Sequence, residues 1–208
     1  MTRRTDITRL AEKRRHDRGE LDALLDSARI GHFALTADHG PVVVPTLVVR
    51  DGDRVLAHGS TGSSWMRLLA SGAPTCLAIT AFDGLVIARS AFESSVHYRS
   101  AVIFGSCTVL DGDDRSAALD HVTDTLVPGR VAELRRPTDR ELAATLVLAL
   151  PIAEWSLKVS AGWPDDPDED VAGPAWAGVV PRHASYGAPI PAPDLRAGID
   201  VPVSVRGL

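Results

Sequence analysis

Short runs that alternate apolar and polar residues, separated by turns rich in Asp and Gly, fill the first third of the chain. Three such runs cover residues 31–37, 41–50 and 54–58. Alternation is the period of a half-buried strand, and Asp-Gly tips between β-branched runs are a strong hairpin signal. The pattern predicts antiparallel strands joined by tight turns, and Pro45 places the second strand at a sheet edge or at a bulge.

The same signals continue downstream. Residues 74–81 and 85–91 predict a hairpin around Phe82-Asp83-Gly84, and residues 98–110 predict the longest strand. A last strand is predicted at residues 152–160. The total is six or seven strands, mostly in hairpins, which favours a small antiparallel barrel over a doubly wound parallel sheet.

Helical spacing of apolar residues is confined to a few segments. Residues 17–28, 65–70 and 115–126 each carry apolar side chains on one helical face. Thr138 with Glu141 three positions later is a capping-box pattern and predicts the start of the last helix. The predicted fold is therefore mainly β with peripheral helices, in the α+β class.

Composition divides the chain into three parts. Residues 1–19 are dominated by charged side chains and predict a polar N-terminal arm, residues 20–160 predict one domain, and residues 161–208 predict an extended tail. The tail is rich in Pro, Gly and Asp. It also carries Trp163 and Trp176, and because tryptophans are costly to leave in water, the tail is expected to pack on the barrel or on a partner subunit.

Charge and cysteine content narrow the class of protein. The 208 residues carry a net charge of −5, which argues against nucleic acid as the main partner. Cys76 and Cys107 form neither a disulfide framework nor a metal-ligand spacing, and two free thiols fit a reducing cytosol. No apolar run approaches the ~18 residues of a membrane span, and the N-terminus lacks a signal core. The prediction is a cytoplasmic protein with no metal site and no membrane partner.

The first candidate site runs from His58 to Arg67, with the sequence His-Gly-Ser-Thr-Gly-Ser-Ser-Trp-Met-Arg. A predicted strand ends here in a turn of small polar residues, and a helix follows. Hydroxyls, backbone N–H groups and the Arg67 guanidinium could bind an anion there. The alternative is a simple N-capped helix, because the spacing matches neither a Walker loop nor a dinucleotide fingerprint.

The second candidate site is Arg99, between Tyr98 and Ser100 at the entrance to a strand. The planar guanidinium fork suits a phosphate or a carboxylate, so Arg99 could face a phosphorylated cofactor. A structural Arg paired with Asp or Glu at a strand end is an equally open interpretation.

Other single residues add weaker signals. His58 ends a strand and could donate a proton to a bound ligand, although a lone His is more often structural. Trp155, Trp163 and Trp176 could cover a planar cofactor, or could serve core or dimer packing.

Several of these motifs occur together in one known family. The motifs are Gly-Ser-Thr-Gly-Ser-Ser-x-x-Arg at residues 59–67, Tyr-Arg-Ser-x-Val-x-Phe-Gly at 98–105, Pro-Gly-Arg at 128–130, Arg-Pro at 136–137 and Trp-Ser-x-Lys at 155–158. Their order and spacing over roughly residues 20 to 180 resemble the pyridoxamine 5′-phosphate oxidase-like flavin-binding split barrels. The branch of flavin-nucleotide-binding and nitroimidazole-resistance proteins is the most similar.

The resemblance implies a six-stranded antiparallel split-barrel homodimer with FMN at the subunit interface. It implies that the phosphate lies near the segment from Ser60 to Arg67, that the flavin ring approaches the backbone of residues 44–46, and that His58 lies beside the active centre. The cofactor-binding residues expected on all these grounds are Val44, Pro45, Thr46, His58, Ser60, Thr61, Ser64, Arg67, Tyr98, Arg99, Ser100, Lys158 and Trp163.

The function predicted from the sequence is an FMN-dependent oxidoreductase acting on a small planar substrate, with His58 as the catalytic residue. One alternative is a non-catalytic protein that binds, stores or senses flavin or haem, with His58 or His97 as an axial ligand. Another is a deazaflavin-dependent reductase. The C-terminal motif of the true oxidases is not evident, so the resemblance favours a flavin fold over oxidation of vitamin B6.

Overall fold

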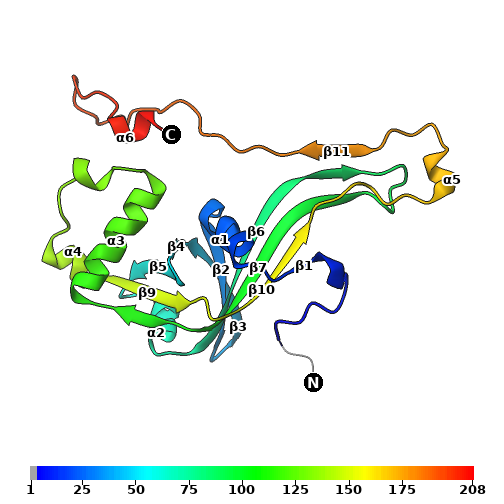
Figure 1. Ribbon diagram of the computed structural model, residues 1–208. Coiled ribbons are helices and arrows are strands. Elements are labelled where there is room, and N and C mark those ends of the chain that lie inside the picture. Colours follow the sequence, from blue (N-terminus) through cyan, green and yellow to red (C-terminus); the bar gives the residue numbers. More distant parts are fainter. Residues whose placement is uncertain (1–3) are drawn as a thin grey trace.

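Two antiparallel sheets with short helices around them form the body of the molecule in the computed structural model, which describes residues 4–208 (Figure 1). The larger sheet runs, in spatial order, β1 (Arg14–Arg15), β10 (Glu154–Ser160), β7 (Ser95–Ser106), β6 (Pro74–Ile87), β2 (Ile30–Ala37) and β3 (Gly40–Leu47), and β11 (Gly178–Pro181) pairs with β6. The smaller sheet runs β4 (Val49–Asp51), β5 (Arg54–Ser60), β9 (Thr145–Pro151) and β8 (Thr108–Leu110). This architecture confirms the predicted α+β fold class.

The helices are short and lie around the sheets. They are η1 (Ala11–Lys13), α1 (Arg18–Ser27), α2 (Ser64–Ala70), α3 (Gly112–Leu126), η2 (Val131–Glu133), α4 (Asp139–Ala143), α5 (Asp168–Val171) and α6 (Val203–Arg206). Sequence signals explain their ends. The Asp17 carboxylate accepts a hydrogen bond from the Glu20 N–H at 3.1 Å and caps α1, and Thr138 and Glu141 form the predicted capping box of α4.

Among the described residues the chain passes between the two sheets four times, once through α2 and three times through only one or two residues. Val48 connects β3 to β4, Cys107 connects β7 to β8, and Ile152 with Ala153 connects β9 to β10. Val48, Cys107 and Ile152 are all buried in the main core. The predicted continuous strands at 41–50 and 98–110 are therefore each broken in two, because the chain turns a corner of the core where each connecting residue lies.

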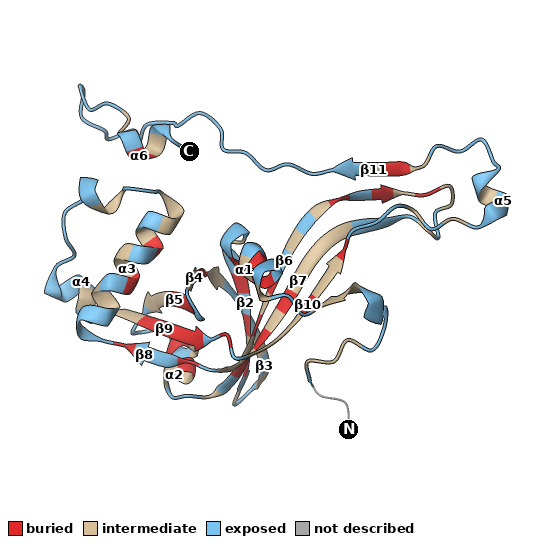
Figure 2. Cartoon of the chain, viewed as in Figure 1, coloured by how far each residue is buried: buried red, intermediate tan, exposed pale blue. Residues whose placement is uncertain are grey.

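The core has two parts. The main cluster fills the space between the sheets and α1, with Phe33, Leu77 and Ile103 fully buried, and α1 adds Leu21 and Leu24. The second cluster lies between α3 and the smaller sheet, with members Val49, Leu56, Leu110, Ala118, Val122, Val147 and Ala149. Figure 2 shows this burial along the central strands, while the outward sides of the helices are exposed.

The predicted hairpin around Phe82-Asp83-Gly84 is wrong. Residues 74–87 form one strand, β6, which is the longest of the described strands, and its pairing with β7 shifts register between Phe82 and Gly84. Gly84 marks a close backbone approach, since a Cβ there would lie 2.6 Å from the Val180 carbonyl oxygen of β11.

The strand β9 is absent from the sequence prediction, which placed a helix after Thr138. Its sequence, Thr-Leu-Val-Leu-Ala-Leu-Pro, is a continuous apolar run with residues 147–150 all buried. A run buried on both faces has no alternation, so periodicity cannot separate it from a buried helix. The helix α4 ends at Ala143 after five residues.

The outer ends of β6 and β7, here called the ribbon (residues 82–98), project from the body, and the tail runs back along it (Figure 1). The Asp166 carboxylate is fully buried and accepts hydrogen bonds from the backbone N–H and guanidinium of Arg89 at 2.8 and 2.9 Å. β11 then pairs with β6. Trp163 and Trp176 remain 80% and 66% exposed in the single chain, so any cover for them has to come from outside it.

The N-terminal arm lies against the larger sheet. Arg14 and Arg15 pair with Lys158 and Leu157 of β10, and the Arg4 guanidinium binds the Glu154 carboxylate. The same guanidinium lies 4.9 Å from the centre of the Phe104 ring.

We expect Gly84→Ala to displace β11 from the ribbon, because the added methyl group would overlap a backbone carbonyl. Overpacking of this kind costs about 1–3 kcal/mol, or roughly ten- to hundredfold faster hydrogen exchange of the β11 amides. Gly162→Ala is the matched control, since a Cβ at Gly162 meets nothing within 4 Å. Unchanged exchange in Gly84→Ala would contradict the close packing of β11 on β6.

Candidate functional site

The segment from β5 to α2 brings four of the expected cofactor residues onto one turn. The Gly62 N–H donates to Ser60 Oγ at 3.1 Å, and the Arg67 guanidinium donates to the Thr61 carbonyl at 3.0 Å. Thr61, Ser64 and Arg67 are exposed. The turn therefore presents hydroxyls and one positive charge to the surface, which is the chemistry that binds a phosphate.

His58 lies one residue before this turn, and its side chain lines a cavity of about 490 Å³. The cavity lies between the smaller sheet and the helices α3 and α4. Its other lining residues are Leu119, Val122, Thr123, Leu134, Arg135, Pro137, Glu141, Leu142 and Thr145. Most of these side chains are apolar, and Arg135 and Glu141 add an exposed ion pair with contacts of 2.6 and 2.8 Å.

The His58 ring is held in an unusual state for a polar group. Its Nδ1 is buried and has no hydrogen-bond partner among the described residues. Burial lowers the pKa of His58 below its ordinary value. The imidazole is therefore neutral at neutral pH, and the residue lines a cavity whose side chains are mostly apolar. The rim stays charged, because the hydrogen bonds from Arg135 and Thr138 lower the pKa of Glu141 to about 2.

A second cavity of about 450 Å³ lies between the β2–β3 hairpin and α2. It brings together two expected cofactor residues that are far apart in sequence, Val44 of β3 and Ser64 of α2. Trp65 forms part of its wall and lies 6.4 Å, centre to centre, from the buried Phe33 ring. Pro45 and Thr46 follow Val44 on the same strand. The segment from His58 to Ser64 thus links the two cavities.

Tyr98, Arg99 and Ser100 lie on β7, and Lys158 of β10 pairs directly with Ser100. The Arg99 guanidinium makes two hydrogen bonds of 2.9 Å to the Asp83 carboxylate at the bulge of β6. This contact is the one expected from the alternative interpretation, in which Arg99 is a structural residue paired with Asp or Glu. Arg99 and Arg67 therefore bind different partners within one chain, and a shared phosphate stays a prediction that a second subunit would have to complete.

His97 lies on the ribbon, away from the His58 cavity, and contacts Gly162, the residue before Trp163. The His97 Nε2 lies 2.7 Å from the Gly162 carbonyl oxygen and 3.0 Å from the Gly162 nitrogen. This ring nitrogen is therefore already engaged by the backbone of the tail. Trp163 follows directly and is mostly exposed.

Sequence reasoning missed the walls of the His58 cavity, which come from α3 and α4. It also missed Arg115, whose Nε is buried with no hydrogen-bond partner among the described residues. Arg115 lies on the same face of α3 as the cavity residues Leu119 and Val122, at spacings of four and seven. The spacing of apolar residues predicted this helical face from the sequence, but the strand that the face covers, β9, was not predicted.

Two broader predictions can be compared with the described part of the chain. Within residues 4–208, no group of three or more His, Cys, Asp or Glu side chains is placed to hold a metal ion. No helix in that range is long and apolar enough to cross a membrane.

The chain matches known proteins in family and in structure. The family model described as pyridoxamine 5′-phosphate oxidase matches residues 17–159. A structure named as the FAD and heme binding protein from Mycobacterium smegmatis is 53% identical, with a TM-score of 0.90 over 94% of this chain and 96% of that chain. The flavocytochrome Anf3 from Azotobacter vinelandii is 34% identical, with a TM-score of 0.91 over 99% and 96% of the two chains.

A more distant structure shares the fold. A protein from Bacteroides thetaiotaomicron, described as a 5-nitroimidazole antibiotic resistance protein, is 18% identical, with a TM-score of 0.61 over 70% of this chain and 86% of that chain. No curated protein matches the chain. The family match over most of the sequence, and the 53% identity over nearly all of both chains, confirm the resemblance: the chain belongs to the pyridoxamine 5′-phosphate oxidase family.

Proposed function

We propose that the chain is a flavin- and haem-binding oxidoreductase. The observation that carries this proposal is the His58 ring, which lines a cavity of about 490 Å³ whose side chains are mostly apolar. The relative from M. smegmatis, 53% identical over nearly its whole length, is named for FAD and haem, and a second relative is named a flavocytochrome.

The His58 cavity suits a haem in size and chemistry. Its volume is within the roughly 300–1,000 Å³ range of small-molecule sites. Leu119, Leu134 and Leu142 supply apolar surface for a flat macrocycle, and Arg135 could bind a carboxylate substituent by exchanging its exposed ion pair with Glu141. A neutral imidazole is the form that binds iron. We therefore propose that His58 would hold the haem iron, in preference to His97, whose Nε2 lies 2.7 Å from the Gly162 carbonyl oxygen.

The flavin is assigned to the surface formed by β3 and the β5–α2 turn. The hydroxyls of Ser60, Thr61 and Ser64 and the guanidinium of Arg67 would hold a phosphate. The backbone of Val44 to Thr46 would lie along the flavin ring, as the family resemblance implies. The sequence-based expectation was FMN, but the name of the 53% identical relative favours FAD. We accordingly propose that the flavin is FAD. Finding FMN or a deazaflavin in the purified protein would overturn this proposal.

The proposed activity is electron transfer to or from a small planar substrate. A flavin supplies one- and two-electron chemistry, and a haem supplies one-electron chemistry. The protein would orient the two groups and exclude water from the His58 cavity. If His58 holds the haem iron, the proton-donor role expected from the sequence would pass to another group. We further propose a cytoplasmic homodimer with flavin at the subunit interface, as the resemblance and the two free thiols suggest.

The haem assignment is tested by the cofactor content of His58→Ala. Wild-type protein is expected to show a Soret band together with flavin bands. The variant should bind haem at least about tenfold more weakly, because it lacks the ligand, and should keep its flavin. The matched control is His97→Ala, which should keep both. Wild-type haem content in His58→Ala, or a wild-type protein with no Soret band, would contradict the assignment.

The flavin assignment is tested at Arg67. Loss of a charge-assisted hydrogen bond costs roughly 1.5–3 kcal/mol, so Arg67→Ala should weaken flavin binding by about ten- to hundredfold. Arg67→Lys keeps the charge and should retain most of the affinity. Fluorescence titration of the apoprotein measures both, and mass spectrometry of the flavin released from wild-type protein separates FAD from FMN and deazaflavin. Equal affinity in Arg67→Ala and wild type would place the phosphate elsewhere.

Arg99 is tested against its own partner. If Arg99 also binds the phosphate, Arg99→Ala should lower flavin affinity by about tenfold or more, while Asp83→Asn, which breaks the same ion pair, should not. Thermal unfolding of both variants measures how much the Arg99–Asp83 ion pair contributes to the stability of the fold. If both variants lose equal stability and keep full flavin affinity, the role of Arg99 is to stabilise the pairing of β6 with β7 and not to bind the phosphate.

A further inference from the structure

The segment that joins β11 to α6, here called the strap (residues 182–202), is fixed at both ends. At one end, the Arg182 N–H donates to the Asp83 carbonyl at 2.8 Å. At the other end, α6 docks on η2, where the Ser204 side chain is buried and both its hydroxyl and its backbone N–H donate to the Glu133 carboxylate. The strap therefore has a defined path between the ribbon and the α3–α4 end of the molecule.

Between these attachments the strap is open and apolar. None of residues 182–202, all of which the structure describes, belongs to a helix or strand. Tyr186 is 69% exposed and Ile190 is 91% exposed, with Leu195 and Ile199 both near 45%. Figures 1 and 2 show the strap crossing from the ribbon to α6 as an exposed chain. Loops longer than about 12–15 residues with no regular structure are uncommon in compact domains and are usually functional.

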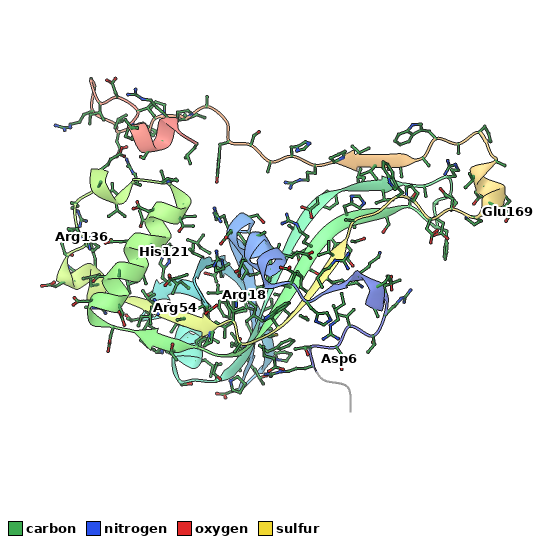
Figure 3. The ribbon with its side chains drawn as sticks, viewed as in Figure 1. Asp6, Arg18, Arg54, His121, Arg136 and Glu169 are labelled. Carbon is green, nitrogen blue, oxygen red and sulfur yellow. The ribbon has the colours of Figure 1, made fainter. Side chains whose placement is uncertain are left out.

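The whole chain has more surface than a compact monomer of its mass. Its accessible area is 12,991 Å², whereas a compact 22.1 kDa monomer has about 9,300 Å². The excess is about 3,600 Å². Obligate homodimers bury roughly 2,000–5,000 Å² in total. The excess exposed area of one copy is therefore large enough to form such an interface. In Figure 3, Glu169 near the tip of the ribbon and Arg136 beside α4 lie at opposite ends of this elongated molecule.

The strap and α6 also form two hollows of about 500 and 550 Å³. Ile190, Leu195, Ile199 and Val205 line the first, and Tyr186, Val201, Val205 and Leu208 line the second. Tyr186 and Ile190 stand at the walls of these hollows, so the strap presents exposed apolar side chains and open apolar space on one surface. A two-fold interface uses the same patch on both copies, and each copy then supplies both parts.

We infer that the strap is a clasp for a second copy of this chain. Each strap closes over the other protomer, and Tyr186 and Ile190 are buried in the contact. The inference rests on the proposed homodimer and adds the segment that holds it together. It also explains why the strap is fixed at its two ends by polar contacts while its middle has no apolar cover within one chain.

The test is sedimentation equilibrium of the full-length holoprotein and two variants. The double variant Tyr186→Asp/Ile190→Asp places two charges in the proposed contact and should raise the dimer dissociation constant by roughly 100-fold or more. Both side chains are exposed in one chain, so folding should be unaffected, and thermal unfolding checks this. The matched control is Val109→Asp on the edge strand β8, which lies on the side of the molecule away from the strap (Figure 2).

Cross-linking identifies the contact directly. A photoreactive Ile190→benzoylphenylalanine chain is mixed with ¹⁵N-labelled wild-type chain, and mass spectrometry reports whether cross-linked peptides join light and heavy chains. Inter-chain cross-links, with weakened dimerisation only in the strap variant, support the clasp. A wild-type dimer that the strap variant leaves intact overturns the clasp but keeps the homodimer. A monomeric wild type overturns both, while its flavin and haem content still tests the cofactor assignments separately.

Discussion

The fold depends on three buried residues at which the chain leaves one sheet and enters the other. Val48, Cys107 and Ile152 each lie in the main core, so the two sheets cannot separate without exposing them. Burial raises the pKa of the Cys107 thiol to about 12, which keeps it protonated and lets it pack as a small apolar group. Because β5 and β9 belong to one sheet and β3 belongs to the other, these three crossings and the passage through α2 set the relative position of the candidate cofactor residues on the two sheets.

The site follows from this arrangement. The segment from His58 to Arg67 runs from the smaller sheet into α2 and links a cavity under α3 and α4 to a cavity beside the β2–β3 hairpin. The proposed phosphate-binding turn and the neutral imidazole lie within ten residues of each other, which would let one short segment position two different cofactors. The same segment could then control the relative placement of both. Its turn is fixed by an internal hydrogen bond of 3.1 Å from the Gly62 N–H to Ser60 Oγ and by one of 3.0 Å from the Thr61 N–H to the Ala144 carbonyl after α4.

Local signals predicted much of the fold. The helix α1, the β2–β3 hairpin and the capping box of α4 each depend on residues close together in sequence. The failures have non-local causes. Gly84 was interpreted as a turn because its partner, β11, lies almost a hundred residues away. The strand β9 was missed because it is buried on both faces, and its neighbours β5 and β8 were needed to identify it.

The candidate site also contains residues that local sequence could identify and residues that depend on distant segments. The turn from Ser60 to Arg67 is contiguous and could be found from its composition. The cavity beside His58 could not, since its walls come from helices that follow the turn by more than fifty residues. The partner of Arg99 was equally hidden, because Asp83 had been assigned to the tip of a hairpin rather than to a bulge facing β7.

The placement of the two apolar clusters has a consequence for how the molecule comes apart. Among the described residues, neither cluster includes any position after Ser160. The tail is held by β11, by the Arg89–Asp166 pair and by the Ser204–Glu133 contacts, all of which are mainly polar. Its opening free energy should therefore be well below that of the body. Denaturation would then proceed in stages, and a single melting temperature would describe the body while leaving an earlier, low-amplitude release of the C-terminal quarter unseen.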